Sequence, residues 1–356
     1  MALLEQQGYR TNLLPAKSGG RLRAEIHYRH GQLPCRVIDV GNRRLSQWEA
    51  VHGKAFDAAF DDELRQFEPD VVFTYPNSPA DFQRHARARR HDARIVVSLV
   101  DERCLTAPPD ALAVYDAALA HGAWQAERHA ESTALRPVVL PPPVPEADVV
   151  PEAREPVCVT FIHPSYQHGA CLLLRLAQQL SLDRPEQPIL VLAPGAAEST
   201  GEGLIEAGLA AGFDLRQHEN ILVSEPARNP REVWALTQVL VAPALAHPPV
   251  TQVAEALVNG IPPVVGDRAG MDLALNGAGF VLPLPLDYTE ETRTALPLTA
   301  VEPWIDLVER LCDDESFYAG ESERARRAAA ALAPAALAPR YAAFFRSVAE
   351  GRRYDG

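Results

Sequence analysis

The segment from His247 to Gly270, HPPVTQVAEALVNGIPPVVGDRAG, holds the residue types in this chain that are best suited to ligand chemistry. It predicts a turn, a short helix over residues 251–259, a tight Gly-Ile-Pro-Pro break, a buried strand over 263–265 and a polar loop. A helix that begins after a strand and a turn presents unbonded N–H groups and its positive dipole end, to which phosphate can bind. One carboxylate, Glu255, lies in the first half of this helix.

Short apolar runs alternate with helical segments through the C-terminal half, which predicts a parallel sheet buried on both faces. The expected strands are 157–162, 189–192, 221–223, 239–241 and 263–265. The expected helices are 169–182, 203–211, 230–237 and 251–259. This βαβ rhythm implies a doubly wound α/β sheet with its ligand at the carboxyl ends of the strands.

The N-terminal half shows the same rhythm less clearly. Strands are expected at 11–14, 71–74, 95–99, 117–120 and 138–140, and helices at 54–67, 79–90 and 124–132. The chain opens in what reads as the tail of a helix, 2–7, so the strand that normally precedes such a helix is not seen. Either the start of the chain is misassigned or the sheet is built without that strand. The proline-rich, acidic stretch 140–156 is expected to be a linker.

Composition excludes several classes of protein. The chain has 356 residues, of which 47% are apolar and 23% charged, so it is globular and long enough for two domains. A net charge of −13 argues against nucleic acid as the main partner. No signal peptide and no run long enough to span a bilayer is visible. The five cysteines form no CxxC pair, which fits reduced thiols in a cytoplasmic protein without a zinc site.

Three stretches in the second half resemble the retaining glycosyltransferases of family 4. The first is VTFIHPSYQHGACLLLRLAQQL from residue 159, the second is ILVSEPARNPREVWALTQVLVAPAL at 221–245, and the third is the His247–Gly270 segment with the LNGAGFVLPLPLDYTEETR that follows it. VEPWIDLVERLCDD and LAPRYAAFF extend the resemblance over most of residues 156–346. PDVVFTYP and VVLPPPVP are similar to the acceptor domain of the same family.

The resemblance implies the GT-B architecture, in which two Rossmann-like domains face each other. The domains are then an acceptor-side domain over 1–140 without its first strand, a linker over 141–156, a donor domain over 157–300 and a helical segment over 301–356 that packs back across both. The implied reaction moves a sugar from a UDP- or GDP-sugar to a glycan, lipid-linked or other hydroxyl acceptor with retention, without an obligatory metal. Membrane contact would be peripheral at most, and a homo- or hetero-oligomer is possible.

The family frames its donor site with two glutamates separated by seven residues. The second matches Glu255, which would bond the nucleotide ribose because a carboxylate can accept from both ribose hydroxyls; the alternative is an ordinary exposed helix glutamate. The first position is His247, a candidate sugar or phosphate contact, or else a surface loop residue. These two are the predicted catalytic residues. The full predicted donor-binding set is His163, Pro164, Ser165, His168, Gly169, Ser224, Glu225, Val250, Thr251, Gln252, Val253 and Glu255.

This chain departs from the family on the phosphate side of the site. The glycine-rich turn reads Pro248-Pro249-Val250, and prolines lack the N–H that would bond a diphosphate. The amides of Thr251, Gln252 and Val253 are still expected to be available. His163 and His168 stand where the family has arginine and lysine, so they can replace that charge only when protonated. Donor binding would then be stronger at low pH; the alternative is that tight binding has been lost.

Two further clusters are ambiguous. Asp101 and Glu102 follow the strand 95–99 and could bond an acceptor hydroxyl, or form a solvated loop. The run QRHARARRHDAR puts Arg84, Arg87, Arg90 and Arg94 at helical spacing, which predicts a solvated face or a contact with anionic lipid or an acidic acceptor.

Two other functions compete with sugar transfer. A degenerate GT-B protein that binds a partner or forms a complex is favoured by the altered phosphate side, and a GT-B sugar-phosphate enzyme is the third possibility.

Overall fold

The computed structural model describes residues 25–30, 33–38, 45–76, 78–192, 203–224 and 229–354. The strand expected at 11–14 and the helix tail at 2–7 lie outside these residues. Two compact units divide the chain. The N-terminal unit contains the described residues up to Ala120, Ala126–Val138 and the chain from Tyr341, and the C-terminal unit contains His121–Gln125 and Val139–Arg340.

The N-terminal unit is built around a four-stranded sheet in the order β3-β4-β5-β6. Its strands are β3 (Val71–Thr74), β4 (Arg94–Leu99), β5 (Ala117–Ala120) and β6 (Pro137–Val139). β4 pairs in parallel with both β3 and β5. Its helices are α2 (Leu45–Phe67), α3 (Pro79–Ala88), α4 (Pro109–Leu112) and α5 (Ala123–Ser132), with a 3-10 turn η1 (Arg89–His91).

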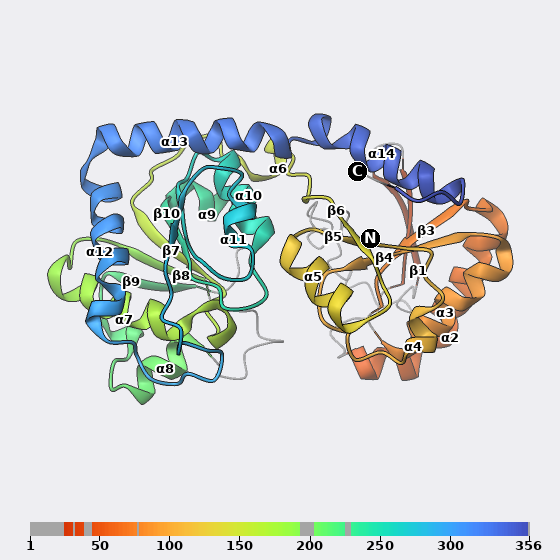
Figure 1. The fold of residues 1–356 in the computed structure, drawn as a ribbon, viewed down its shortest axis with the longest axis horizontal. Helices are drawn as coiled ribbons and strands as arrows, with labels where there is room; N and C mark the ends of the chain where they lie inside the picture. Colours follow the sequence, from red (N-terminus) through yellow and green to blue (C-terminus); the bar gives the residue numbers. More distant parts are fainter. Residues whose placement is uncertain are drawn as a thin grey trace, which may run out of the picture. The chain divides into compact units, whose positions relative to one another are not determined.

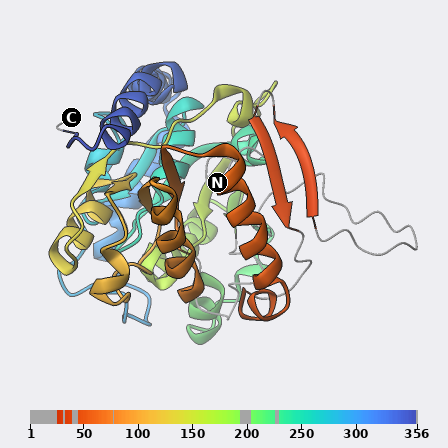
Figure 2. The ribbon, with the colours of Figure 1, turned by 90° about the vertical axis from the view of Figure 1, so that its right-hand side faces the viewer.

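A β-hairpin precedes this sheet. Strands β1 (Glu25–His30) and β2 (Leu33–Ile38) are antiparallel, with Glu25 opposite Ile38, and Figure 2 shows them side by side. No strand was expected at these residues from the sequence.

The C-terminal unit contains a six-stranded sheet in the order β12-β11-β10-β7-β8-β9, and every neighbouring pair is parallel. Its strands are β7 (Cys158–Ile162), β8 (Ile189–Leu192), β9 (Ile221–Ser224), β10 (Thr237–Ala242), β11 (Pro263–Gly266) and β12 (Phe280–Leu282). The side chains of β8 and β11 are buried throughout, which is why these runs are continuously apolar.

Helices cover both faces of this sheet (Figure 1). One apolar cluster joins the sheet to α7 (Ala170–Asp183), α8 (Leu204–Ala210) and α12 (Leu298–Asp313). The other joins it to α9 (Pro230–Leu236), α10 (Val250–Val258), α11 (Met271–Ala274) and α13 (Glu315–Ala329). The unit therefore has the doubly wound architecture that the sequence predicts.

The stretch 141–156, which was expected to be a linker, packs closely on the C-terminal unit. Its short helix α6 (Glu146–Val149) buries Val149 in the core. Arg154 donates to the carbonyls of Trp234 (3.3 Å), Thr237 (2.7 Å) and Asn259 (2.6 Å). These bonds tie the ends of α9 and α10 together, so this stretch is part of the domain and not a free spacer.

The chain ends in a long helical stretch, α13, the 3-10 turn η4 (Ala330–Leu332) and α14 (Pro334–Ala349). By length and composition alone, Glu315–Ala349 could cross a membrane, and 22% of its most apolar window is buried. Leu332, Leu337 and Phe344 are buried, so this stretch uses one face for packing within the protein.

Apart from the β1–β2 hairpin, the expected strands and helices agree with the described elements to within a few residues, with two main exceptions. Helix α2 begins at Leu45, nine residues before the expected start at 54. Strand β12 was not predicted, because its three residues are too short to show a period.

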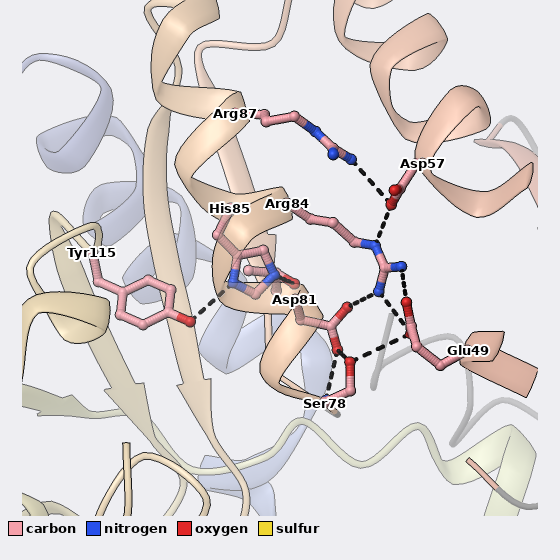
Figure 3. Close-up of polar contacts among 9 residues, drawn as sticks. Glu49, Asp57, Ser78, Asp81, Arg84, His85, Arg87 and Tyr115 are labelled. Atoms are coloured by element: carbon pink, nitrogen blue, oxygen red, sulfur yellow. Dashed lines mark hydrogen bonds and ion pairs between the residues drawn. The ribbon is translucent and has the colours of Figure 1, made fainter. Parts of the chain in front are cut away.

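Arg84 is the centre of a buried ion-pair network that joins α2 to α3 (Figure 3). Only 2% of the residue is exposed. Its guanidinium contacts carboxylates of Glu49 and Asp57 on α2 and of Asp81 on α3, the last two at 2.7 and 2.8 Å. Burial alone would raise the pKa of Asp57, but the bonds from Arg84 and Arg87 lower it.

His85, next to Arg84, uses both ring nitrogens inside the unit. Its Nε2 lies 3.0 Å from Thr74 Oγ1 and its Nδ1 2.9 Å from Tyr115 Oη. Burial lowers the pKa of His85 to about 4, although the negative charge of Asp81 acts to raise it. The arginine run is therefore not a uniformly solvated face, and a contact of its exposed members, Arg90 and Arg94, with lipid or an acidic acceptor stays a prediction. Arg84 and Arg87 pair with acids of α2, because α3 packs its basic face on that helix.

We expect Arg84→Met to destabilise the protein by about 3 kcal/mol, because removal of one partner from a buried network leaves uncompensated charges. Chemical denaturation measures this free energy of unfolding. Arg65→Met is the matched control, since the Arg65 side chain is 61% exposed and, among the residues that the structure describes, its ion pair is with Asp62 on the same helix. Equal effects of the two substitutions would show that the network does not hold α2 to α3.

Candidate functional site

The loop after β7 forms one wall of the predicted site. Here His163-Pro164-Ser165 leads into the 3-10 turn η2 (Tyr166–His168) and then Gly169, which begins α7. The Pro164 carbonyl accepts from the Leu204 N–H at 2.8 Å. Gly169 has φ +86°, and a Cβ there would lie 2.5 Å from the Pro243 carbonyl oxygen. Glycine is therefore required for this loop to approach the end of β10.

The turn after β10 is bonded directly to η2. The Gln167 carbonyl accepts from the N–H groups of Leu245 (2.9 Å) and Ala246 (3.1 Å). His168 Nε2 lies 3.0 Å from the His247 carbonyl oxygen. All strands of this sheet are parallel, so these two loops leave its carboxyl edge together. The structure thus brings the two stretches that the sequence analysis singled out into one place.

His168 is held as a neutral side chain. A proton on Nε2 donates to the His247 carbonyl, and Nδ1 then accepts from Ser165 Oγ at 2.8 Å. Burial lowers the pKa of His168 to about 4, with smaller effects from the neighbouring His247 and His163. Near neutral pH His168 therefore does not supply the positive charge that a lysine would carry at this position.

His163 and His247 share an uncommon backbone conformation. Both have φ of +49°, in the left-handed region that non-glycine residues adopt rarely. Such strain is concentrated at functional sites, where the surrounding structure enforces it. His163 directly follows β7, and His247 lies in the turn between β10 and α10.

Helix α10 begins one residue earlier than predicted, at Val250, and this changes which amides are available. The Val253 N–H donates to the Pro249 carbonyl at 3.0 Å, and the Val250 N–H donates to the Pro248 carbonyl at 2.8 Å. The expectation that Val253 offers a free amide is therefore wrong. Within the described part of the chain, the amides of Thr251 and Gln252 have no hydrogen-bond acceptor.

The other end of α10 is closed by a complete Schellman motif. The Ile261 N–H donates to the Ala256 carbonyl and the Gly260 N–H donates to the Leu257 carbonyl, both at 2.9 Å. Gly260 has φ +66°, as this cap requires. The cap ends the helix just before β11 and so holds it at a definite position on the sheet.

Glu255 of α10 is half-buried and is bonded to a tryptophan. Its Oε2 accepts from Trp234 Nε1 at 2.9 Å, and Trp234 is 1% exposed. Burial raises the pKa of Glu255 to about 7, although the Trp234 bond opposes this rise. Glu255 is therefore not an ordinary exposed helix glutamate, and its carboxyl group titrates near neutral pH.

The remaining predicted residues lie apart from this cluster or outside the described chain. Ser224 ends β9 and is exposed, and Glu225 lies outside the described residues. In the N-terminal unit, Asp101 Oδ1 accepts from the Arg103 N–H at 2.9 Å, and Glu102 pairs with Arg128. Both acids thus have local partners, and an acceptor-binding role for them stays a prediction.

Two neighbours of the site were missed by the sequence analysis. Trp234 lies 21 residues before Glu255, with no local pattern that links them. The Arg293 guanidinium lies 3.9 Å from the centroid of the Tyr166 ring, beside η2. A cavity of about 210 Å³ also adjoins the first turn of α10, where Pro248, Val250 and Leu273 contribute to its lining. Among the described residues, no group of His, Cys, Asp or Glu is placed to hold a metal ion.

Comparison with solved structures relates this architecture to known proteins. Sucrose-phosphate synthase from Thermosynechococcus elongatus is 12% identical over 92% of this chain and 86% of that chain, with a TM-score of 0.65. Anabaena HepE in complex with UDP-glucose is 15% identical over 86% and 84%, with a TM-score of 0.60. A glycosyltransferase from Rickettsia africae is 11% identical over 88% and 84%, with a TM-score of 0.58.

No family model matches the sequence, and no curated protein matches it by sequence. At sequence identities this low, the structural likeness to these proteins shows the fold of this chain. The chain has two parallel-sheet, Rossmann-like α/β domains of the GT-B type.

We expect Glu255→Gln to stabilise the protein more at pH 8 than at pH 6. The pKa of Glu255 is about 7 in the folded state, against the ordinary glutamate value of 4.5. Between these two pH values the folded state binds more protons than the unfolded state, so the wild type loses stability as the pH rises through this window. At 1.36 kcal/mol per pKa unit, the gain of the variant should grow by about 1 kcal/mol between these two pH values. Denaturation at both pH values measures it; a constant difference would contradict the assigned burial.

Proposed function

We propose that this protein is a glycosyltransferase that moves a sugar from a UDP- or GDP-sugar to a hydroxyl acceptor with retention, as in family 4. The observation that carries the proposal is the joining of η2 to the turn before α10 at the carboxyl edge of the sheet. A ligand at such an edge is the rule for doubly wound sheets. The structural likeness to a glycosyltransferase from Rickettsia africae and to HepE in complex with UDP-glucose supports the same reaction class.

In this proposal the donor diphosphate binds at the start of α10. The Thr251 and Gln252 amides and the dipole of the helix stabilise the negative charge that grows on the leaving diphosphate. Glu255 accepts from the ribose as a carboxylate, and His247 contacts the transferred sugar. The sugar C1–O bond to the diphosphate breaks, the acceptor oxygen bonds to C1 on the same face, and its proton passes to the diphosphate oxygen.

The proposal needs no metal, and the acceptor is a glycan, a lipid-linked sugar or another hydroxyl compound. We place the protein in the cytoplasm in this proposal, which fits its five scattered cysteines without a CxxC pair. The competing hypothesis, a degenerate protein that binds only a partner, predicts no response to any nucleotide.

Thermal-shift titration with UDP, GDP, UDP-glucose and GDP-mannose tests the proposal. We expect one base to stabilise the protein, and Glu255→Ala to weaken that binding by about tenfold, the effect of one lost charged hydrogen-bond acceptor. Glu232→Ala, on the neighbouring helix α9, is the control and should bind as the wild type does. A protein stabilised by neither base at any pH would sink the proposal and favour the degenerate alternative.

We expect the bound nucleotide sugar to bind about tenfold more tightly at pH 8 than at pH 6, since only the ionised form of Glu255, with a pKa near 7, accepts from both ribose hydroxyls. This is the reverse of the dependence expected from charged histidines, because His168 stays neutral down to about pH 4. Calorimetry across this range measures the dissociation constant. Tighter binding at pH 6 would assign the pH dependence to the histidines.

A further inference from the structure

We propose that Trp234 is a positioning residue for the donor: its indole N–H holds Glu255 Oε2 and leaves Oε1 to accept from the nucleotide ribose. This inference rests on the proposed function. Trp234 cannot touch the donor as the side chain is placed, since it is 1% exposed and packs among the residues of the α10 face of the sheet. Any effect of Trp234 on donor binding therefore acts through Glu255.

The first support is the geometry of the bond. The indole N–H is a donor only, and its distance of 2.9 Å to Oε2 is that of a well-formed hydrogen bond. Because the ring is enclosed, the N–H points in one direction. A glutamate side chain on a helix otherwise has several rotamers, so this bond selects one of them before the donor arrives.

The second support is that the backbone around Trp234 is also fixed. Arg154 donates to the Trp234 carbonyl and to the carbonyls of Thr237 and Asn259. Asn259 in turn donates through Nδ2 to the carbonyls of Val149 (3.3 Å) and Glu255 (3.0 Å). The end of α9 and the end of α10 are thus held by the same arginine, which keeps the indole at its place below the carboxylate.

The third support is the electrostatic isolation of Glu255. The charged or titratable groups on the surrounding helices and loops are Glu146 and Asp148 of α6, Arg154, Arg231 and Glu232 of α9, His247 before α10, Asp272 of α11, and Glu315, Tyr318, Glu321, Glu323, Arg324, Arg326 and Arg327 of α13. Within the described residues, none of them forms an ion pair or a side-chain hydrogen bond with the Glu255 carboxylate. The Trp234 N–H is therefore the interaction that favours the ionised form against burial.

A matched control is present on the opposite face of the same sheet. Trp304 of α12 is also fully buried, at 0% exposure, but its indole N–H has no acceptor in the described part of the chain. Replacement of either tryptophan by phenylalanine removes a similar volume from the core. Only Trp234→Phe also removes a bond to Glu255.

The test compares the wild type, Trp234→Phe and Trp304→Phe by calorimetry with UDP-glucose or GDP-mannose, whichever binds, from pH 6 to pH 9.5. Loss of the bond raises the pKa of Glu255, so Trp234→Phe should move the midpoint of the pH dependence upward by about one unit. Its affinity should fall at least threefold at pH 7.5 from the change in ionisation. A weaker affinity than the wild type should persist at pH 9.5, where Glu255 is ionised in both proteins, because the selected rotamer is lost. Trp304→Phe should leave the midpoint unchanged, although both variants lose stability.

A second readout follows the indole itself. Tryptophan fluorescence of the free protein should titrate with a midpoint near pH 7, and this step should be absent in Glu255→Gln and Trp234→Phe but present in Trp304→Phe. An unchanged binding midpoint in Trp234→Phe, with donor binding intact, overturns the inference alone. Binding of neither nucleotide sugar by the wild type overturns the proposed function and the positioning role with it.

Discussion

The site depends on the attachment of one loop to another at the carboxyl edge of the C-terminal sheet. The Gln167 carbonyl and the His168 ring of η2 bond to Leu245, Ala246 and His247, and Gly169 allows the close approach that this requires. Without these bonds the start of α10 and the loop after β7 would move independently. With them, the amides of α10, the strained histidines and Glu255 belong to one rigid edge, which is the preorganisation that electrostatic catalysis needs.

Burial of Glu255 opposes the stability of the fold, and this opposition points to function. A hydrophobic residue would pack against Trp234 without the cost of a carboxylate that ionises at neutral pH. The fold nevertheless devotes several interactions to holding the carboxylate and indole together, among them Arg154 and the Schellman cap after Asn259. Groups that destabilise a structure while being held firmly in place are typical of ligand-binding sites.

Most strands and helices of the C-terminal unit could be predicted because their signals are local. The buried runs of β8 and β11 are continuously apolar, and Asn229-Pro230 marks the start of α9, where Asn229 caps the Arg231 amide. The interactions that define the site could not be predicted in this way. Trp234 and Glu255 are 21 residues apart, and Arg84 and Glu49 are 35 apart. Both pairs exist only because two helices pack together. The error at Val253 has a similar origin, since a shift of one residue in the helix start decides which amide is free.

The neutral state of His168 changes how a diphosphate would have to be stabilised. Both ring nitrogens of His168 are used within the protein, so the imidazole acts as a tie between two loops and not as a counter-charge. The charge on the diphosphate would then be met by dipoles, namely the N–H groups of Thr251 and Gln252 and the axis of α10. Such dipoles do not titrate. Glu255, whose pKa lies near 7, therefore gives the site a pH dependence of its own, and the indole bound to it sets where that transition falls.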